Sequence, residues 1–375
     1  MFVAPPAPDY DGGSLASVLP SVGAALAVPG YWDLLGLGDG FRRVVVVLID
    51  GLGLSGLTAH SDQAPFMNGA DVRGIHAAVP TTTPTGLASL GTGSPPGAHG
   101  LVGASFMVEG HHGLLHPLQW QDQPSPHVVQ PEPTMLERLS QRGVEVTSIG
   151  PRAYEKSALT LAALRGGTYR GADSVGERLA ELLAARTPSV PALTYVYWPD
   201  LDRTGHGHGV DSDHWRQELA HVDYIVERIA ALCTPDDLLL VTADHGMVDV
   251  DPKNRIEIDE IPALRHHVLN IGGEPRCRFI YTRVGHEQEV AAVWRESLGD
   301  YAWIMTRDEA IAAGYFGTTE PVVADRIGGV IAWAKDAWSL SSMSTDARVS
   351  RLRGQHGSLT APEVEIPLIT MTGGA

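Results

Sequence analysis

Cysteine and positive charge are both scarce in this chain of 375 residues. Its two cysteines, Cys233 and Cys277, are too few for a disulfide framework or a thiolate metal cluster. The 27 Lys and Arg residues are outnumbered by 44 Asp and Glu residues, which gives a formal net charge of -17. This balance argues against a nucleic-acid polymer or an anionic membrane surface as partner. A small phosphate ester stays open, because one site can differ in sign from the whole molecule.

We find no pattern expected of a secretory leader and no apolar run as long as a membrane span. The first residues, MFVAPPAPDYDGG, contain neither a basic n-region nor an apolar h-region. The moderately apolar segment 14–38 is interrupted by Pro20, Pro29 and Asp33, and no stretch reaches the length of a membrane span. We therefore expect a cytoplasmic protein without a membrane partner, in which residues 1–40 form an N-terminal arm that carries no chemistry.

The strongest local pattern is FRRVVVVLIDGLGLS, residues 41–55. Its uninterrupted and largely β-branched apolar run predicts a central strand of a parallel sheet, covered on both faces. Asp50 follows at the carboxyl end of that run, the edge at which open α/β sheets place their ligands. Because Asp before Gly51 is also common in turns, Asp50 alone does not define a site.

A second predicted strand, residues 192–198 (ALTYVYW), leads into the segment PDLDRTGHGHG. Asp202 and His206 are four residues apart in this segment, a spacing that can turn both side chains toward one cation. Asp200 is an alternative to Asp202, and His208 is an alternative to His206. We prefer the pair with the four-residue spacing.

Two further segments place ligand-type residues at strand ends. The segment 236–247, DDLLLVTADHGM, is an apolar strand followed by Asp244 and His245, and the next glycine permits a sharp turn. Near the end of the chain, His356 lies in a Gly-flanked loop before a final apolar strand at 364–371. These residues and Asp50 are expected to meet at one edge of the sheet.

The segment 79–103, VPTTTPTGLASLGTGSPPGAHGLVG, contains a run of threonines before a short helical pattern. Pro84 suits the first position of a helix, which makes Thr83 a candidate N-cap whose hydroxyl meets the positive end of the helix dipole. A cap of this kind needs no chemical role. The alternative is a hydroxyl that faces the predicted cluster of carboxylates and imidazoles.

Together these segments supply six residues of the kind that bind metal ions, and one hydroxyl. Carboxylate oxygens mixed with imidazole nitrogens, without thiolates, suit zinc better than manganese or iron. Three ligand aspartates would bring a charge of about −3, which two divalent cations would convert to roughly +1. We therefore expect two divalent metal ions, preferably Zn²⁺, in a pocket that attracts an anion.

In this combination the motifs resemble those of the alkaline phosphatase superfamily, and within it the nucleotide pyrophosphatase/phosphodiesterase family. The matching segments cover nearly the whole chain in motif order: VLIDGLG, PTTTPTGLASLGTGSPPGAHG, PDLDRTGH, TADHG and QHG. The resemblance implies a three-layer α/β sandwich with a mostly parallel central sheet and helices on both faces. It also implies a catalytic domain over residues 41–375, with a smaller inserted cap within 250–324.

The resemblance also implies roles for individual residues. One metal ion would be held by Asp50, Asp244 and His245 together with the nucleophile, and the other by Asp202, His206 and His356. Thr83 falls where the family has its nucleophilic threonine, with Thr81 and Thr82 as the alternatives.

Two departures from the family pattern concern substrate binding. Ala104 stands where family phosphodiesterases carry an Asn that donates to a phosphate oxygen, so Ser105 or a backbone N–H near Thr83 would have to replace it. Thr85-Gly86 stands where the family has Pro-Asn after the nucleophile. Because no cysteine lies near the nucleophile position, a sulfatase is disfavoured.

The sequence therefore predicts a metal-dependent hydrolase of phosphodiester or nucleotide pyrophosphate bonds that forms a covalent phospho-threonine intermediate. Its substrate would be a small phosphate ester or nucleotide. The alternatives are a phosphomonoesterase or phosphonate hydrolase on the same scaffold, and a non-catalytic protein that binds metal. A dinucleotide-binding protein is disfavoured, since no GxGxxG motif joins the first strand to a helix.

Overall fold

The main body of the molecule is built on a seven-stranded sheet, seen in a computed structural model that describes residues 4–121, 123–185 and 190–373. The strand order is β2-β17-β8-β1-β7-β5-β6. The strands are β1 (Arg43–Ile49), β2 (Asp71–His76), β5 (Glu145–Gly150), β6 (Thr168–Gly171), β7 (Ala192–Trp198), β8 (Asp237–Thr242) and β17 (Glu365–Thr372). Strand β17 runs antiparallel to the other six strands of this sheet, which all point the same way. The prediction of a mostly parallel sheet is confirmed.

Strand β1 is central and its residues are all buried, as its unbroken apolar run predicted. Val46 pairs in register with Tyr195 of β7 on one side and Leu240 of β8 on the other. Residues 50, 199 and 243 therefore leave the sheet at the same edge. This parallel register brings the predicted ligand segments together.

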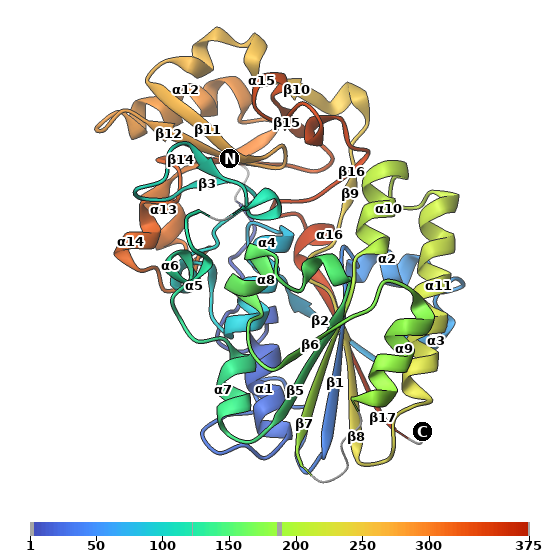
Figure 1. Cartoon of the computed structure of the whole chain (residues 1–375). Helices are drawn as coiled ribbons and strands as arrows, with labels where there is room; N and C mark the ends of the chain where they lie inside the picture. Colours follow the sequence, from blue (N-terminus) through green and yellow to red (C-terminus); the bar gives the residue numbers. More distant parts are fainter. Residues whose placement is uncertain (1–3, 122, 186–189, 374–375) are drawn as a thin grey trace.

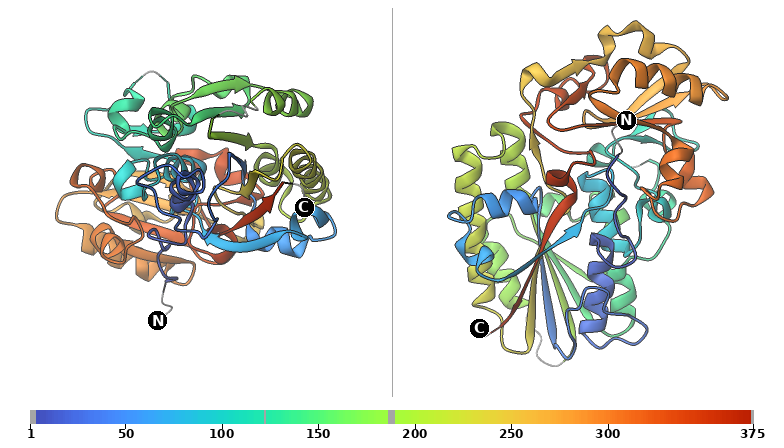
Figure 2. Two further views of the ribbon diagram at one scale, coloured as in Figure 1. Left: turned by 90° about the horizontal axis from the view of Figure 1, so that it is seen from below. Right: turned by 180° about the vertical axis from the view of Figure 1, so that it is seen from behind.

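Helices cover both faces of the sheet, which confirms the three-layer arrangement (Figures 1 and 2). One layer contains α1 (Val18–Ala25), α4 (Thr83–Thr92), α7 (Met135–Gln141) and α8 (Ala158–Ala163). The other contains α2 (Leu54–Ala59), α3 (Pro65–Asn68), α9 (Val175–Ala184), α10 (Asp200–His208) and α11 (Asp213–Ala230). Leu15, Leu19 and Val22, which precede the first strand, are buried in the main core. The segment around α1 is thus an integral part of this layer.

A smaller antiparallel sheet, of order β11-β12-β14-β13, lies beyond the carboxyl edge of the main sheet (Figure 1). Its elements are β11 (Val268–Glu274), β12 (Cys277–Thr282), α12 (Glu287–Leu298), β13 (Ala302–Thr306) and β14 (Val330–Ala334). It has a hydrophobic core of its own that includes Trp294 and Leu298. We call residues 255–346 the cap. The cap extends past residue 324, where the sequence predicted its end, because β14 pairs with both β12 and β13.

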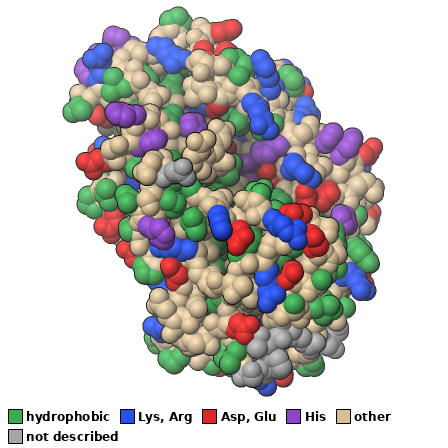
Figure 3. Space-filling view, viewed as in Figure 1, with side chains coloured by type: hydrophobic (Ala, Val, Ile, Leu, Met, Phe, Trp, Pro, Cys, Tyr) green, Lys and Arg blue, Asp and Glu red, His purple; other side chains and the backbone are tan. Residues whose placement is uncertain are grey.

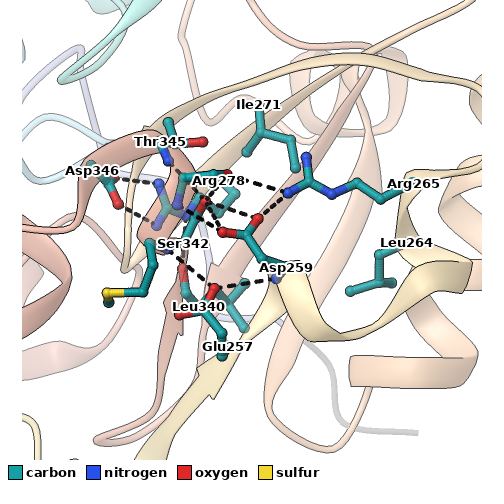
Figure 4. A network of polar contacts seen from close by, with 12 residues as sticks. Glu257, Asp259, Leu264, Arg265, Ile271, Arg278, Leu340, Ser342, Thr345 and Asp346 are labelled. Atoms are coloured by element: carbon teal, nitrogen blue, oxygen red, sulfur yellow. Dashed lines mark hydrogen bonds and ion pairs between the residues drawn. The ribbon is translucent and has the colours of Figure 1, made fainter.

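A polar network ties the strands of the cap to its outer loops (Figure 4). The guanidinium of Arg278 on β12 donates to both carboxylate oxygens of Asp346, at 2.5 and 3.0 Å. Asp259 accepts from the hydroxyl of Ser342 at 3.1 Å and pairs with Arg265. These contacts join the segments on either side of the small sheet into one unit.

Shorter elements complete the described chain. The remaining strands are β3 (Phe106–Met107), β4 (Leu114–Leu115), β9 (Val248–Asp249), β10 (Arg255–Glu257), β15 (Ser339–Ser341) and β16 (Gly354–Gln355). The remaining α-helices are α5 (Pro96–His99), α6 (Pro126–Val129), α13 (Arg307–Ala312), α14 (Pro321–Ala324), α15 (Met343–Asp346) and α16 (Ala361–Val364). The 3-10 helices are η1 (Leu15–Ser17), η2 (Pro117–Gln119), η3 (Arg152–Tyr154), η4 (Pro252–Asn254), η5 (Ile258–Glu260), η6 (Pro262–Arg265) and η7 (Val349–Arg351). Among the residues described, no helix is both long and apolar enough to span a bilayer.

Candidate active site

Two clusters of carboxylates and imidazoles form at the carboxyl edge of the main sheet. The first consists of Asp50, Asp244 and His245, and the second of Asp202, His206 and His356. Within each cluster the potential ligand atoms all lie within 4.8 Å of one another. The clusters adjoin, since the rings of His245 and His356 stack with centroids 3.8 Å apart. The structure thus brings together all six residues that the sequence singled out, and Figure 3 shows histidines where cap and main body meet.

Helix α10 accounts for the spacing of Asp202 and His206. Residues four apart lie on one face of a helix, and here Asp202 Oδ2 is 3.3 Å from His206 Nε2. The alternatives are engaged elsewhere. Asp200 pairs with Arg203 at 2.5 Å, and the ring of His208 stacks on that of His214.

The three site histidines each present Nε2 to the clusters. Their Nδ1 atoms contact the backbone carbonyls of Gly354, Thr81 and Gly246, at 2.8, 2.9 and 3.1 Å for His206, His356 and His245 respectively. Since a carbonyl only accepts, Nδ1 carries the proton and Nε2 keeps its lone pair. The Nε2 atoms of His206 and His356 are 3.3 Å apart, so two lone pairs face each other. A cation between them would remove this repulsion.

The aspartates of the clusters also have buried ligand atoms without a hydrogen-bond partner among the described residues. These atoms are Asp50 Oδ1, Asp202 Oδ1 and Asp244 Oδ2. Burial raises the pKa of Asp50 well above its usual range, and the nearby charges of Asp244 and Asp202 raise it further. Burial also raises the pKa of Asp244. Because buried anions need a counter-charge, this donor set fits a pair of divalent cations.

The remaining carboxylate oxygens are held by hydrogen bonds that orient the ligands. Tyr197 Oη donates to Asp50 Oδ2. Asp244 Oδ1 accepts from the backbone N–H groups of Gly51 and His245, at 3.3 and 3.1 Å. No local motif marks Tyr197, because its role depends on the pairing of β7 with β1, where it lies opposite Leu48.

The structure separates the three neighbouring threonines. Thr82 rather than Thr83 is the N-cap of α4, so the expectation of a capping role for Thr83 was wrong. The hydroxyl of Thr81 donates to the carbonyl of Ser358 at 2.8 Å and supports the loop that carries His356. Thr83 Oγ1 lies 3.2 Å from His245 Nε2 and therefore faces the first cluster.

Helix α4 can approach the cluster this closely because residue 86 is glycine. A Cβ at Gly86 would lie 2.8 Å from Asp244 Cβ and 2.9 Å from the Asp244 carbonyl oxygen. Gly51 is similarly confined, with a φ of +76° and only 2.9 Å between a built Cβ and Asp202 Cβ. Glycine at both positions permits the close packing of ligand-bearing segments.

Thr83 also lines a cavity of about 320 Å³ beside the clusters. Its walls are mainly apolar and aromatic and include Leu87, Leu118, Trp120, Tyr154, Leu159 and Tyr169. None of the described lining residues is Lys, Arg, Asp or Glu. The segment 105–133 supplies the wall at Leu118 and Trp120. The site therefore combines an ion-binding edge with an uncharged pocket.

Strand β11 of the cap contacts Ser105 and contributes Glu274. The predicted substrate contact Ser105 donates its hydroxyl to the carbonyl of Gly273 at 2.9 Å, which holds it against strand β11. The neighbouring Glu274, which sequence analysis missed, lies with Oε2 at 3.7 Å from His356 Nδ1. Burial raises the pKa of Glu274 well above its usual range, although a hydrogen bond with Thr82 counters part of this shift.

The fold and the clusters together define a member of the alkaline phosphatase superfamily, a class of metal-dependent phosphoryl-transfer enzymes. More specifically, residues 44–359 match the type I phosphodiesterase/nucleotide pyrophosphatase family. The chain belongs to this family, as its motifs indicated.

Solved structures with the same fold include two kinds of enzyme. Murine ectonucleotide pyrophosphatase/phosphodiesterase 5, as an inactive variant in complex with AMP, is 20% identical with a TM-score of 0.67 and 87% of each chain covered. Phosphonoacetate hydrolase from Sinorhizobium meliloti 1021, in complex with phosphonoformate, is 17% identical with a TM-score of 0.66, covering 88% of this chain and 90% of the other.

Similar curated sequences include phosphopentomutases. The protein from Anaeromyxobacter dehalogenans is 28% identical over 157 residues, which is 41% of this chain and 38% of the relative. The protein from Legionella pneumophila (strain Paris) is 29% identical over 155 residues, 41% of this chain and 35% of the relative. These matches span less than two fifths of each relative's length.

Proposed function

We propose that this protein hydrolyses phosphodiester or nucleotide pyrophosphate bonds, with Thr83 as the nucleophile and two divalent cations as cofactors. The observation that carries the proposal is the position of Thr83 Oγ1, 3.2 Å from His245 Nε2 and on the wall of the uncharged cavity. This hydroxyl adjoins the ligand clusters, whereas that of Thr81 is bonded to a backbone carbonyl.

Each cluster would hold one cation. Asp50, Asp244 and His245 would bind the ion beside Thr83, and Asp202, His206 and His356 would bind the other. The mixture of carboxylates and imidazoles without thiolates favours zinc. When bound, such ions would supply the positive charge that lowers the pKa of the Thr83 hydroxyl and stabilises the oxygen leaving phosphorus.

Thr83 forms a bond to phosphorus in the first half of the proposed reaction. Its Oγ attacks as the bond from phosphorus to the ester or anhydride oxygen breaks, and the hydroxyl proton passes to solvent. The departing oxygen takes up a proton unless its own pKa leaves it ionised. A water molecule then attacks phospho-threonine and releases the phosphate product together with a restored Thr83 hydroxyl. The net reaction adds one water across the original bond.

The cavity beside Thr83 favours a diester or pyrophosphate over a small monoester. Its apolar and aromatic walls suit an uncharged organic group such as a nucleobase or an aryl ring. No cationic side chain among the described lining residues is available to an anionic group placed inside this cavity. A substrate with an apolar substituent on phosphorus would therefore contact the apolar walls of this cavity. A phosphonate that carries a carboxylate would not make these contacts.

Steady-state kinetics with two aryl phosphates tests this substrate preference. Zinc-loaded protein should hydrolyse bis-p-nitrophenyl phosphate with a higher kcat/KM than p-nitrophenyl phosphate. Clear preference for the monoester would replace the proposal with a phosphomonoesterase. Hydrolysis of neither ester, nor of a dinucleotide, by protein shown to contain metal would favour a non-catalytic binding protein.

Replacement of Thr83 tests the nucleophile. Thr83→Ala should reduce kcat by at least ~10³-fold, because the hydroxyl that attacks phosphorus is gone, while the bound metal measured by mass spectrometry stays unchanged. Thr83→Ser should retain part of the activity. Thr85→Val is the matched control in the same helix, since Thr85 Oγ1 is buried without a hydrogen-bond partner among the described residues. Full activity of Thr83→Ala would exclude Thr83 from the mechanism.

A further inference from the structure

A second group of imidazoles lies on the cap, formed by residues that take no part in the proposed reaction. His266 and His267 precede β11, and Glu289 lies in the first turn of α12. One ligand atom from each of these three residues lies within 4.8 Å of the others. His286, the N-cap of α12, adds a fourth group, with Nδ1 at 3.0 Å from Glu289 Oε2.

The distances between these groups suit a tetrahedral ion. His266 Nε2 is 3.8 Å from Glu289 Oε1, and His267 Nε2 is 3.7 Å from Glu289 Oε2. Bonds of about 2.0–2.1 Å around a tetrahedral zinc ion would place neighbouring ligand atoms roughly 3.4 Å apart. The two imidazole–carboxylate separations exceed this value by only a few tenths of an ångström.

The rings are packed in a way that simple ion pairing does not explain. The centroids of His267 and His286 are 3.6 Å apart with nearly parallel planes, and those of His266 and His267 are 3.9 Å apart. Three protonated imidazoles at these separations would repel one another, and Glu289 supplies a single negative charge. Because a carboxylate oxygen only accepts, His286 Nδ1 donates to Glu289 Oε2, which leaves His266, His267 and Glu289 as the candidate ligands.

His267 adopts a backbone conformation that β-strand entry does not require. Its φ is +58°, in the left-handed region that side chains other than glycine rarely adopt. The backbone N–H of Arg283 donates to the His267 carbonyl at 2.9 Å and fixes this conformation. A strained backbone at a ligand-type residue is a recurrent feature of functional positions. Here it places the imidazole of His267 between those of His266 and His286.

We propose that His266, His267 and Glu289, whose carboxylate is held by His286, form a separate binding site on the cap for a transition-metal cation of the zinc type. Imidazole and carboxylate donors favour Zn²⁺, Cu²⁺ or Ni²⁺ over Mg²⁺ and Ca²⁺. The site is open to solvent, since the side chains of His266 and Glu289 are 66% and 52% exposed. A bound ion would join the segment before β11 to the start of α12 and so stabilise the cap.

Counting bound ions tests the proposal. The double variant His267→Asn/Glu289→Gln removes two donors, and Asn tolerates the left-handed conformation at residue 267. After loading with zinc alone and removal of the excess, mass spectrometry should find one ion fewer per chain than in the unaltered protein. The unfolding temperature should rise less with zinc in the variant, and turnover of bis-p-nitrophenyl phosphate should stay unchanged.

The control Glu218→Gln/His221→Gln removes the same kinds of groups from α11, where Glu218 Oε1 lies 3.8 Å from His221 Nδ1. It should bind as many ions as the unaltered protein. Equal zinc content in the cap variant and this control would overturn the proposed site. Loss of the cap ion does not depend on whether the catalytic clusters bind metal. The variant Asp50→Asn, measured alongside, removes a ligand from the first catalytic cluster and so distinguishes failure of the cap site from failure of the proposed function.

Discussion

At the scale of single residues, backbone carbonyls decide which nitrogen of each site histidine can bind a metal ion. The protons on Nδ1 of His206, His245 and His356 are committed to carbonyl oxygens, so each Nε2 is ready as a ligand. Burial lowers the pKa of His356 well below its ordinary value, and protonation of His245 or His206 would lower it further. The protein thereby prepares its ligands before any ion arrives.

Tyr197 should contribute to metal affinity through Asp50. Because its hydroxyl donates to Asp50 Oδ2, Tyr197→Phe leaves that oxygen without its donor and should weaken metal binding ~10–100-fold, as expected for a group that orients a ligand. Calorimetric titration of metal-free protein with zinc measures the change. Tyr195→Phe is the matched control, since Tyr195 lines the same cavity and its hydroxyl has no hydrogen-bond partner among the described residues. Equal loss in both variants would argue against a specific role for Tyr197.

His99 should make stability depend on pH. Burial and the charge of Arg326 lower its pKa from 6.5 to about 3, so the unfolded chain binds a proton more readily than the folded chain. The stabilisation is complete above pH 6.5 and is lost as pH falls toward 3, with a slope approaching about 1.4 kcal/mol per pH unit. The free energy of unfolding, measured in urea between pH 5 and 7, should change less with pH for His99→Gln than for the exposed-site control His127→Gln. Equal slopes would contradict the prediction.

The different roles of the neighbouring threonines could not be predicted from the sequence. Sequence reasoning found the site residues by type and motif, but it placed the N-cap of the helix one residue too late. Thr81 and Thr83 have identical side chains and differ only in what surrounds them after folding. The hydrogen bonds of Thr81 to the loop of His356 arise between segments about 275 residues apart, which local sequence does not specify.

At the scale of elements, the secondary structure of residues 199–209 departs most from what local helix propensity predicts. The segment PDLDRTGHGHG contains Gly205 and Gly207, which disfavour a helix, yet α10 spans most of it. Packing against α11 compensates for the low helix propensity of glycine, and Gly205 faces Trp215 and Met247 at close range. Strands with strong apolar runs are easier to predict, and residues 192–198 form a strand as expected.

Gly86 should be essential to the junction of α4 with the first cluster. Gly86→Ala should reduce metal content and activity by at least tenfold, because the added methyl group would meet Asp244 at 2.8 Å and displace this ligand. In a helix this substitution is otherwise favourable by ~1 kcal/mol. Gly176→Ala in α9, where a Cβ would meet nothing within 4 Å, is the control and should leave metal content unchanged. Metal analysis and kinetics on the two purified variants decide between these outcomes.

At the scale of the whole molecule, one buried ion pair joins the cap to the main body. Arg276, in the turn between β11 and β12, donates to both carboxylate oxygens of Glu363 on α16, at 3.0 and 2.6 Å. Both side chains are fully buried. Glu363 also accepts from the backbone N–H of Ser358 at 3.0 Å, close to the loop of His356. The orientation of the cap and the position of a metal ligand thus depend on one carboxylate.

Breaking this pair should destabilise the protein strongly. Arg276→Met leaves the Glu363 carboxylate buried without its cation, at a cost of ~3–5 kcal/mol in the free energy of unfolding. The double variant Arg276→Met/Glu363→Gln should recover part of this loss, because the buried charge is gone. Urea unfolding measures both. Arg152→Met, which breaks an exposed ion pair with Asp173, should have a much smaller effect. A similar effect of Arg276→Met and Arg152→Met would contradict this account.

The position of strand β17 between β8 and β2 has a consequence for how the chain is made. The edges of β8 and β2 are both in place once residue 242 has been synthesised, but residues 365–372 fill the gap only after the whole cap has followed. Until then the growing chain exposes unpaired strand edges, which are prone to pair with other molecules. A ribosome that stalls within the cap would release a fragment inclined to aggregate.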